Sequence, residues 1–400
     1  MEASGAAEGA AGKGRLASRA SIFKPSPIQA LSKLSDSECA INLAEGFPDY
    51  PSPEFIKDAG VAAIEADHNQ YSCVDALNEA IAARFKEAQG IEISPQDNVV
   101  VCVGQTEAMA AAVMAVVDPG DEVVMFEPVF ETYPACVRLA GGVPSCVALF
   151  PPSWAWDPSE LRAAFSPKTK AVIVNSPHNP TGRVWTRAEL EEVAALCQEF
   201  DVIAITDEVY EEFTYHGAEH VSMAAIKGMR ERTVVTSSLS KTFSVTGWRI
   251  GWAIAPPDIA AAISAIKVKF TDSAPAPFQH AAVVALNGCG AGFYEEQRLE
   301  YAMRREATMS MLKNFGFGVA EGPEGAFYVF AELPAWAGGD DVAFVENLIK
   351  TAGVAMVPGS VFFTGSGEPG ASFGRRFVRV AFCKKLTTLG AAAKALEAVA

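Results

Sequence analysis

The sequence predicts an α/β protein built on a mostly parallel sheet, with a smaller α+β unit packed against it. Short apolar runs rich in β-branched residues alternate with amphipathic helical stretches through the middle of the chain. Strands that are apolar on both faces and separated by helices are typical of a parallel sheet covered on both sides. The runs lie at 98–103, 122–127, 171–176, 202–207, 233–238 and 248–255, and the helical stretches include 105–117 and 187–199.

After Pro256 and Pro257 the pattern changes to one long helical run followed by shorter strands and helices. We therefore expect residues 56–292 to form a large α/β domain and residues 21–55 and 293–400 to form a small α+β domain. Residues 1–20 are rich in Ala, Gly and Ser and are expected to be a disordered tail. The helices of the later part are expected at 293–316, 341–351 and 387–400, and its strands at 327–333, 354–359 and 376–383.

The composition excludes several classes of partner. The net charge is -16, from 32 basic and 48 acidic side chains, whereas nucleic acids and anionic membranes attract proteins of the opposite sign. The chain has no apolar run long enough to span a bilayer and no secretory signal, so we expect a cytoplasmic protein, with organellar import through the tail left open. The 8 cysteines contain no C-x-x-C pair, so we expect reduced, mostly core cysteines and no metal site.

The segment SSLSKTFSVTGWRIGW, residues 237–252, carries the strongest chemical signal. Lys241 follows a predicted strand among small and apolar residues, where loss of hydration lowers a lysine pKa. An uncharged lysine amine is what condensation with an aldehyde requires. Ser238 and Arg249 offer a hydroxyl and a fork of donors suited to a phosphate. The alternative is a solvent-exposed lysine at a strand end, with Arg249 in an ordinary ion pair.

Two further strand ends carry polar side chains. Asp207, in ITDEVYEE, ends an apolar strand and would suit a protonated pyridine nitrogen, with Tyr210 bonding to the ring's oxygen; the alternative for Asp207 is a helix N-cap. Asn179, in VNSPHNPTG, lies in a turn and can donate its amide to a ring oxygen or a substrate carboxylate; the alternative is a simple turn.

The segment VCVGQTEAMAAA runs from a strand through Gly104, Gln105 and Thr106 into a helix, and the free N–H groups of the helix start with the Thr106 hydroxyl would bind an anion. The alternative is an ordinary loop between a strand and a helix. Phe130, in EPVFETY, would lie flat on an aromatic ring or else fill the core. Neither a Rossmann G-x-G-x-x-G nor a Walker A loop is present, which argues against nucleotide cofactors.

Arg379 lies on the predicted strand of RRFVRVAFCKK, on the same face as Phe377 and Ala381. An arginine on a largely apolar strand needs an anion, and a substrate carboxylate would bind it in a bidentate manner. A structural ion pair is the alternative.

Taken in order, GQTEA, EPVF-ETY, NSPHNPTG, DEVY, SSLSK-TFS-TGWRIGW and RVAF resemble the motifs of class I/II aminotransferases, which are pyridoxal-phosphate (PLP) enzymes of fold type I. The resemblance covers about residues 21–400 and implies a large domain with a mostly parallel, seven-stranded sheet and a smaller α+β domain. INLAEGFPDY (41–50), NQY (69–71) and PHNPTGRVWTRAELE are similar to the kynurenine, glutamine and methionine aminotransferases in particular.

The resemblance implies a role for each residue in moving an amino group from an L-amino acid to a 2-oxo acid by a ping-pong mechanism. It implies that Lys241 holds the cofactor and shuttles the α-proton, and that Arg379, Asn179 and the backbone at Gly46 bind the substrate. It also implies a homodimer in which Tyr71 reaches the partner's cofactor. The cofactor contacts that it implies come from Asp207, Tyr210, Asn179, Phe130, Gln105, Thr106, Ser238 and Arg249.

The sequence departs from the family pattern in places that affect specificity. The segment SCVDALNEA after Tyr71 is shortened, and KPSPIQ (24–29) stands where relatives often carry an aromatic residue. Two other functions share these motifs: a PLP lyase on the same fold, such as a cysteine-conjugate β-lyase or an aminocyclopropane-carboxylate synthase, and a non-catalytic regulator. The regulator would need a DNA-binding module, for which the tail offers no sequence.

Overall fold

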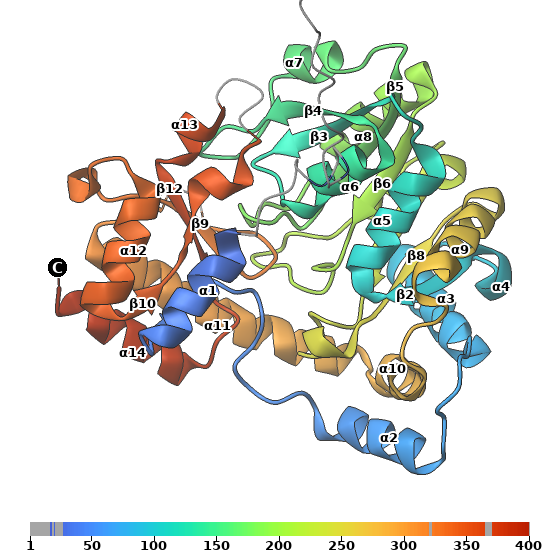
Figure 1. The fold of residues 1–400 in the computed structure, drawn as a ribbon, viewed down its shortest axis with the longest axis horizontal. Helices are drawn as coiled ribbons and strands as arrows, with labels where there is room; N and C mark the ends of the chain where they lie inside the picture. The colour runs from blue at the N-terminus through green and yellow to red at the C-terminus, as the bar shows by residue number, and fades with distance from the viewer. Residues whose placement is uncertain (1–16, 18–19, 21–26, 320–321, 365–369, 400) are drawn as a thin grey trace, which may run out of the picture.

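The computed structural model describes residues 17, 20, 27–319, 322–364 and 370–399. The predicted tail, 1–20, therefore lies outside the described residues except at two positions. Within the described part, a large sheet with helices on both faces stands beside two small sheets with their own helices (Figure 1).

The large sheet has seven strands in the order β2-β8-β7-β6-β5-β3-β4. Only β8 runs antiparallel to its neighbours, so the predicted mostly parallel sheet is confirmed. The bounds are β2 Val99–Val103, β3 Glu122–Glu127, β4 Val143–Ala148, β5 Thr169–Asn175, β6 Ile203–Asp207, β7 Thr233–Ser238 and β8 Ile250–Ile254. The sequence analysis missed β4, because this edge strand is half exposed and carries Pro144, which breaks the apolar pattern.

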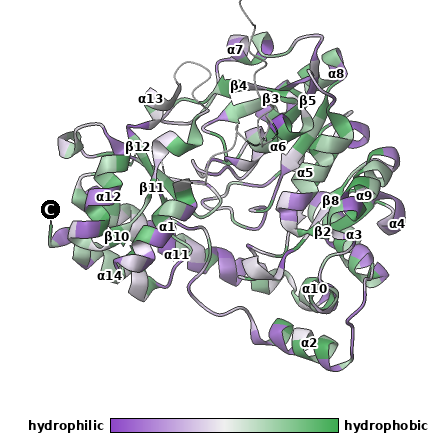
Figure 2. Ribbon diagram, in the orientation of Figure 1, coloured by the Kyte–Doolittle hydropathy of each residue, from purple (hydrophilic) through white to green (hydrophobic). Residues whose placement is uncertain are grey.

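Successive side chains of one strand enter different hydrophobic cores, as expected for a sheet buried on both faces. Val123 and Met125 of β3 pack with helices α5, α6 and α9, whereas Val124 and Phe126 pack with α8. The strands of this sheet are largely hydrophobic along their length (Figure 2). These helices are α5 Gly104–Val116, α6 Thr132–Ala140, α8 Arg187–Phe200 and α9 Pro257–Thr271.

The smaller sheets join the two ends of the described chain. Strand β1 (Ile41–Asn42) pairs with β10 (Val354–Ala355), so the blue N-terminal helix α1 lies among the red C-terminal elements in Figure 1. The second small sheet has the order β11-β12-β9, with β9 Tyr328–Glu332, β11 Val357–Pro358 and β12 Phe377–Ala381. Its surrounding helices are α1 Pro27–Ser37, α11 Ala291–Phe315, α12 Asp341–Ala352, α13 Gly370–Gly374 and α14 Leu386–Glu397. The domain boundaries at 55/56 and 292/293 stay predictions.

The remaining helices lie before and beside the large sheet. They are α2 Glu54–Glu65, α3 Asp75–Gln89, α4 Pro95–Asn98, α7 Pro158–Ala163 and α10 Ala276–Gly288. Among the helices described, none is long and apolar enough to pass through a bilayer. All eight cysteines are described and free; four are buried, but Cys39 and Cys73 are exposed, so the expectation of core positions is wrong for those two.

Candidate functional site

Three neighbouring strands and one helix start deliver polar side chains to the same edge of the large sheet. Strand β5 ends at Asn175, β6 at Asp207 and β7 at Ser238. Strand β2 runs straight into α5 at Gly104. Ligands of α/β sheets bind beyond the carboxyl ends of the strands, so this edge is where a site is expected.

A cavity of about 300 Å³ opens at this edge. Its lining includes almost every residue singled out from the sequence: Gly46, Gln105, Thr106, Phe130, Asn179, Asp207, Tyr210, Ser238, Lys241, Arg249 and Arg379. Tyr71 is the exception. It is 80% exposed and lines a different hollow together with Thr271 and Pro275, so the described chain does not bring it to the cavity. Its predicted contact with a partner's cofactor stays a prediction.

Lys241 lies in the turn after β7, where it is partly buried and lines the cavity. Its Nζ donates a hydrogen bond to the backbone oxygen of Gly46 at 3.2 Å. Burial lowers the pKa of Lys241, and the charges of Arg379 and Arg249 lower it further, against the opposing effect of Asp207. The structure therefore places this amine as the sequence suggested, with its charged form disfavoured.

Asp207 is buried, and no helix begins at it, so its alternative as a helix N-cap is wrong. One carboxylate oxygen, Oδ2, accepts a hydrogen bond from the Tyr133 hydroxyl at 2.7 Å, and Oδ1 accepts one from the backbone N–H of Val209 at 3.2 Å. Burial raises the pKa of Asp207 to about 6, although the Tyr133 bond opposes the rise. The sequence analysis missed Tyr133, which lies in the EPVFETY segment already singled out for Phe130.

Tyr210 meets a second tyrosine that the sequence analysis missed. The Tyr210 hydroxyl lies 3.0 Å from the hydroxyl of Tyr328 on β9, and both rings are buried. Tyr328 also fills the space next to Gly46, where an added Cβ would lie 1.9 Å from the Tyr328 hydroxyl oxygen. Glycine is therefore the residue that fits at position 46.

Arg249 points toward the start of α5. Its guanidinium donates to the backbone oxygens of Thr246 at 3.0 Å and Val103 at 3.3 Å, and among the described ion pairs none involves it. Its charge therefore remains available for an anion at the helix start, where the free N–H groups of α5 also point. Gln105 and Ser238 border the same region: Gln105 donates to Thr236 at 3.1 Å, and Ser238 accepts from the Ser240 N–H at 3.3 Å.

Arg379 is buried on β12 and faces the cavity. It donates to the Asn179 side-chain oxygen at 3.0 Å and to the Ala44 backbone oxygen at 2.8 Å. Its Nε has no hydrogen-bond partner within the described part of the chain, and no carboxylate there pairs with it. The alternative of a structural ion pair therefore finds no support among these residues. Asn175, also missed, fixes the Asn179 backbone by accepting its N–H at 2.7 Å.

Phe130 lines the cavity and is only partly buried, and its ring stands at 74° to that of Tyr133 at a centroid distance of 5.7 Å. It packs against the core beside α5 and α6 and is also available as a wall for a ligand.

The charges of this cavity suit two anionic groups. Lys241, Arg249 and Arg379 line it, and none of the three takes part in a described ion pair. The start of α5 with Arg249 forms one anion site, and Arg379 with Asn179 forms the other. The buried Asp207 carboxylate lines the same cavity and offers a partner for a cation. A flat cofactor with an anionic tail and a basic ring nitrogen, together with a small carboxylate, fits this donor set.

Comparisons with known proteins agree with this chemistry. Residues 39–396 match the family of class I and II aminotransferases. The solved structure of N-succinyldiaminopimelate aminotransferase from Mycobacterium tuberculosis superposes with a TM-score of 0.91 at 36% identity, covering 96% of this chain and 100% of that one.

Two curated relatives match over most of their length. Human kynurenine–oxoglutarate transaminase 1 is 34% identical, covering 90% of this chain and 92% of that protein. Aspartate aminotransferase of Geobacillus stearothermophilus is 36% identical, covering 87% and 92%. The matched region includes the three strand ends, the start of α5 and Arg379. The chain belongs to the class I and II aminotransferases, enzymes that transfer amino groups between amino acids and 2-oxo acids.

Proposed function

We propose that this aminotransferase uses pyridoxal 5'-phosphate and transfers the amino group of an amino acid with an uncharged side chain to a 2-oxo acid by a ping-pong mechanism. The observation that supports the cofactor best is the set of cavity cations without ion-pair partners around one buried carboxylate. A phosphate and a substrate carboxylate supply the two anions that this set needs, and the ring nitrogen of pyridoxal supplies the cation for Asp207.

The residues divide into groups that would hold different parts of the cofactor. Arg249, Ser238, Gln105 and Thr106 would hold its phosphate at the start of α5. The remaining contacts come from Asp207 at the ring nitrogen, Phe130 on the ring face, Tyr210 and Asn179 at the ring oxygen, and Lys241 at the aldehyde carbon. When bound, the protonated pyridine ring draws electrons from the substrate's α-carbon, which makes its proton removable.

Lys241 would also act as the base and acid of the reaction. Its lowered pKa leaves a larger fraction of the amine uncharged, and only that form accepts a proton from the substrate's α-carbon. Arg379 would bind the substrate's carboxylate and fix the α-carbon near Lys241. Asn179 supports this binding because it holds the Arg379 guanidinium through a 3.0 Å hydrogen bond.

The rest of the lining indicates which side chains the substrate can carry. Beyond the groups assigned above, Ile28, Gln29, Phe47, Glu45 and Glu131 line the cavity. Among the described lining residues, Glu45 adds a carboxylate and no further cation is present, so a second substrate carboxylate would meet like charge there. We therefore favour kynurenine, glutamine, methionine or aromatic amino acids as donors over aspartate and glutamate.

A panel of amino acids tests both parts of this proposal. Each amino acid is mixed with the PLP-loaded enzyme without a 2-oxo acid, and conversion of the cofactor to its amine form is followed by absorbance. We expect kcat/KM for the best uncharged donor to exceed that for aspartate by about 100-fold, as a like-charge contact of a few kcal/mol would produce. Faster conversion by aspartate would contradict the substrate assignment, and no conversion by any amino acid would contradict the cofactor assignment. Pyruvate and ammonia released without an acceptor would instead identify a lyase.

Gly104 offers a test of the phosphate site in which none of the assigned residues is itself replaced. It adopts φ +72, and an added Cβ would lie 2.1 Å from the Arg249 Nη2. Gly104→Ala should therefore displace Arg249 and weaken PLP binding by about tenfold, beside a loss of about 1–2 kcal/mol in unfolding free energy from the left-handed backbone.

Fluorescence titration with PLP and thermal unfolding of the cofactor-free protein measure these two effects. Gly120→Ala is the matched control, because Gly120 has φ +94 but nothing within 4 Å of an added Cβ. If both variants lose affinity equally, backbone strain and not Arg249 explains the loss.

A further inference from the structure

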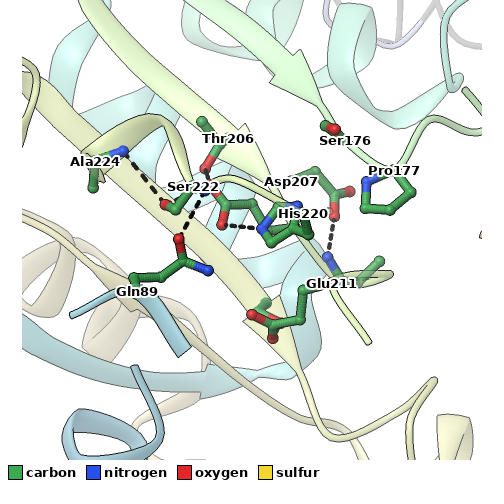
Figure 3. Close-up of polar contacts among 12 residues, drawn as sticks. Gln89, Ser176, Pro177, Thr206, Asp207, Glu211, His220, Ser222 and Ala224 are labelled. Carbon is green, nitrogen blue, oxygen red and sulfur yellow. Dashed lines mark hydrogen bonds and ion pairs between the residues drawn. The ribbon is translucent and has the colours of Figure 1, made fainter. Parts of the chain in front are cut away.

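Next to Asp207, but outside the cavity lining, lies a second cluster of buried ionisable side chains (Figure 3). Glu208 follows Asp207 directly, and its side chain is 3% exposed. The Nε2 atom of His220, whose side chain is 5% exposed, lies 2.9 Å from the Glu208 Oε2. When the imidazole is protonated, the two buried groups form an ion pair that the solvent hardly screens.

The other oxygen of Glu208 is also fully engaged. Its Oε1 accepts hydrogen bonds from the hydroxyls of Thr206 at 2.8 Å and Ser222 at 2.9 Å. Ser222 is itself anchored to α3, because its backbone N–H donates to the Gln89 side chain at 3.0 Å. The carboxylate after Asp207 is therefore held from three sides by the strand, by the loop that carries His220 and Ser222, and indirectly by α3.

Glu211 completes the cluster and links it to the next strand. It accepts a hydrogen bond from the hydroxyl of Ser237, at the end of β7, at 2.9 Å. Burial, followed by the charge of Glu212, raises the pKa of Glu211 to about 7. Burial alone would lower the pKa of His220, but the hydrogen bond and charge of Glu208 and the charges of Glu211 and Glu212 raise it above its usual value. These neighbours therefore favour the protonated, cationic form of the imidazole.

The cluster adjoins a hollow of about 660 Å³, larger than the active-site cavity. Glu208, Glu211 and His220 place ligand atoms within 4.8 Å of one another, which raises the question of a metal ion. The hydrogen bonds argue against one. Both Glu208 oxygens and the His220 Nε2 are already engaged with protein donors and acceptors, so an ion would have to displace these bonds.

We propose that the buried Glu208–His220 pair is a positioning device for Asp207: it holds the end of β6 in place and cancels the negative charge that Glu208 would otherwise exert on the neighbouring carboxylate. This inference rests on the proposed role of Asp207 toward the ring nitrogen. This inference gives His220 a positioning role, although His220 does not line the cavity.

The charges of Glu208 and His220 have opposite effects on the pKa of Asp207. The groups around Asp207 are Tyr133 on α6, Lys241 after β7, and Glu208 beside it in the chain; burial raises the Asp207 pKa most, and Glu208 raises it further. Without the His220 cation, the uncompensated Glu208 raises the pKa of Asp207 more, so Asp207 holds a proton at higher pH. Replacing Glu208 with a neutral residue has the opposite effect.

His220→Asn, Glu208→Gln and the double variant separate this role from a merely structural one. The measurement is the Kd for PLP between pH 5 and 8, read from the fluorescence of the cofactor-free protein, because an ionised Asp207 tightens the binding that the phosphate contacts already provide. We expect the midpoint of the His220→Asn profile to move up by about one pH unit, that of Glu208→Gln to move down, and that of the double variant to return toward the wild type. Titration of the cofactor's own phosphate is common to all variants and cancels in the comparison.

The outcomes decide the proposal. Equal midpoints in all variants overturn it, even if their melting temperatures fall. Retention of one equivalent of Zn²⁺ by the wild type and its loss in His220→Asn would also overturn it and make the cluster a metal site. His216→Asn is the control, because His216 lies in the same loop but is exposed. If Asp207→Asn binds PLP as tightly as the wild type, the proposed role of Asp207 is wrong, and the positioning role of this cluster is wrong with it.

Discussion

Replacing Lys241 with alanine is expected to lower kcat for amino transfer by at least about 10⁴-fold, because both proton transfer and the covalent hold on the cofactor depend on one amine. No other described lysine lines the cavity. Single-turnover mixing of the PLP-loaded variant with the best donor of the panel measures the effect. The yellow colour of the lysine-bound cofactor should also be lost, and borohydride should no longer fix the cofactor to the chain.

Lys267→Ala is the matched control for this variant. Lys267 is more buried than Lys241, at 5% exposure, but it lies on α9 and donates to the Asp272 backbone oxygen at 3.0 Å, away from the cavity. We expect its folded fraction to keep the wild-type turnover. A Lys241→Ala enzyme that turns over within tenfold of the wild type would refute the assignment of the base.

Asp207→Ala should leave the cofactor bound through its phosphate but lower kcat by about 10²–10³-fold, which corresponds to about 3–4 kcal/mol of lost transition-state stabilisation. The physical reason is that a buried carboxylate is needed to keep the pyridine nitrogen protonated. Steady-state kinetics and the Kd for PLP together measure this, and we expect kcat to fall more than affinity.

A buried aspartate elsewhere controls for the loss of a buried carboxylate as such. Asp341 is 0% exposed and accepts the Ser360 N–H at 2.7 Å, but it does not line the cavity. Asp341→Ala should lose stability and keep kcat in its folded fraction. An unchanged kcat in Asp207→Ala would remove the carboxylate from the reaction and leave the ring nitrogen without its partner.

Much of this site could be predicted because its residues sit where strong local signals end. A buried strand that stops at a polar residue, as at Asp207 or Ser238, is visible in the sequence as an apolar run followed by a break. The parallel arrangement of the strands then brings these breaks to one edge. Arg379 was found in the same way, as a charge within an apolar strand.

The rest could not be predicted because it depends on contacts between distant segments. Tyr328 bonds to Tyr210 across 118 positions, and nothing in its own strand distinguishes it from a core aromatic residue. His220 reaches Glu208 only because the loop between them folds back, and a lone histidine in a polar loop carries no local signal. Ile28 and Gln29 line the cavity, and both belong to the segment 24–29 in which the sequence departs from the family pattern.

Two parts of the chain that have different tasks together form the cavity. The groups assigned to the cofactor lie on strands of the large sheet, on the loops that follow these strands and on α5, whereas Arg379 and Tyr328 come from β12 and β9, more than 70 positions beyond the last large-sheet strand. Mutations that reshape the small antiparallel sheet can therefore alter which amino acid is accepted while the proposed cofactor contacts stay intact. Substrates and products can therefore change during evolution while the chemistry of amino transfer is kept.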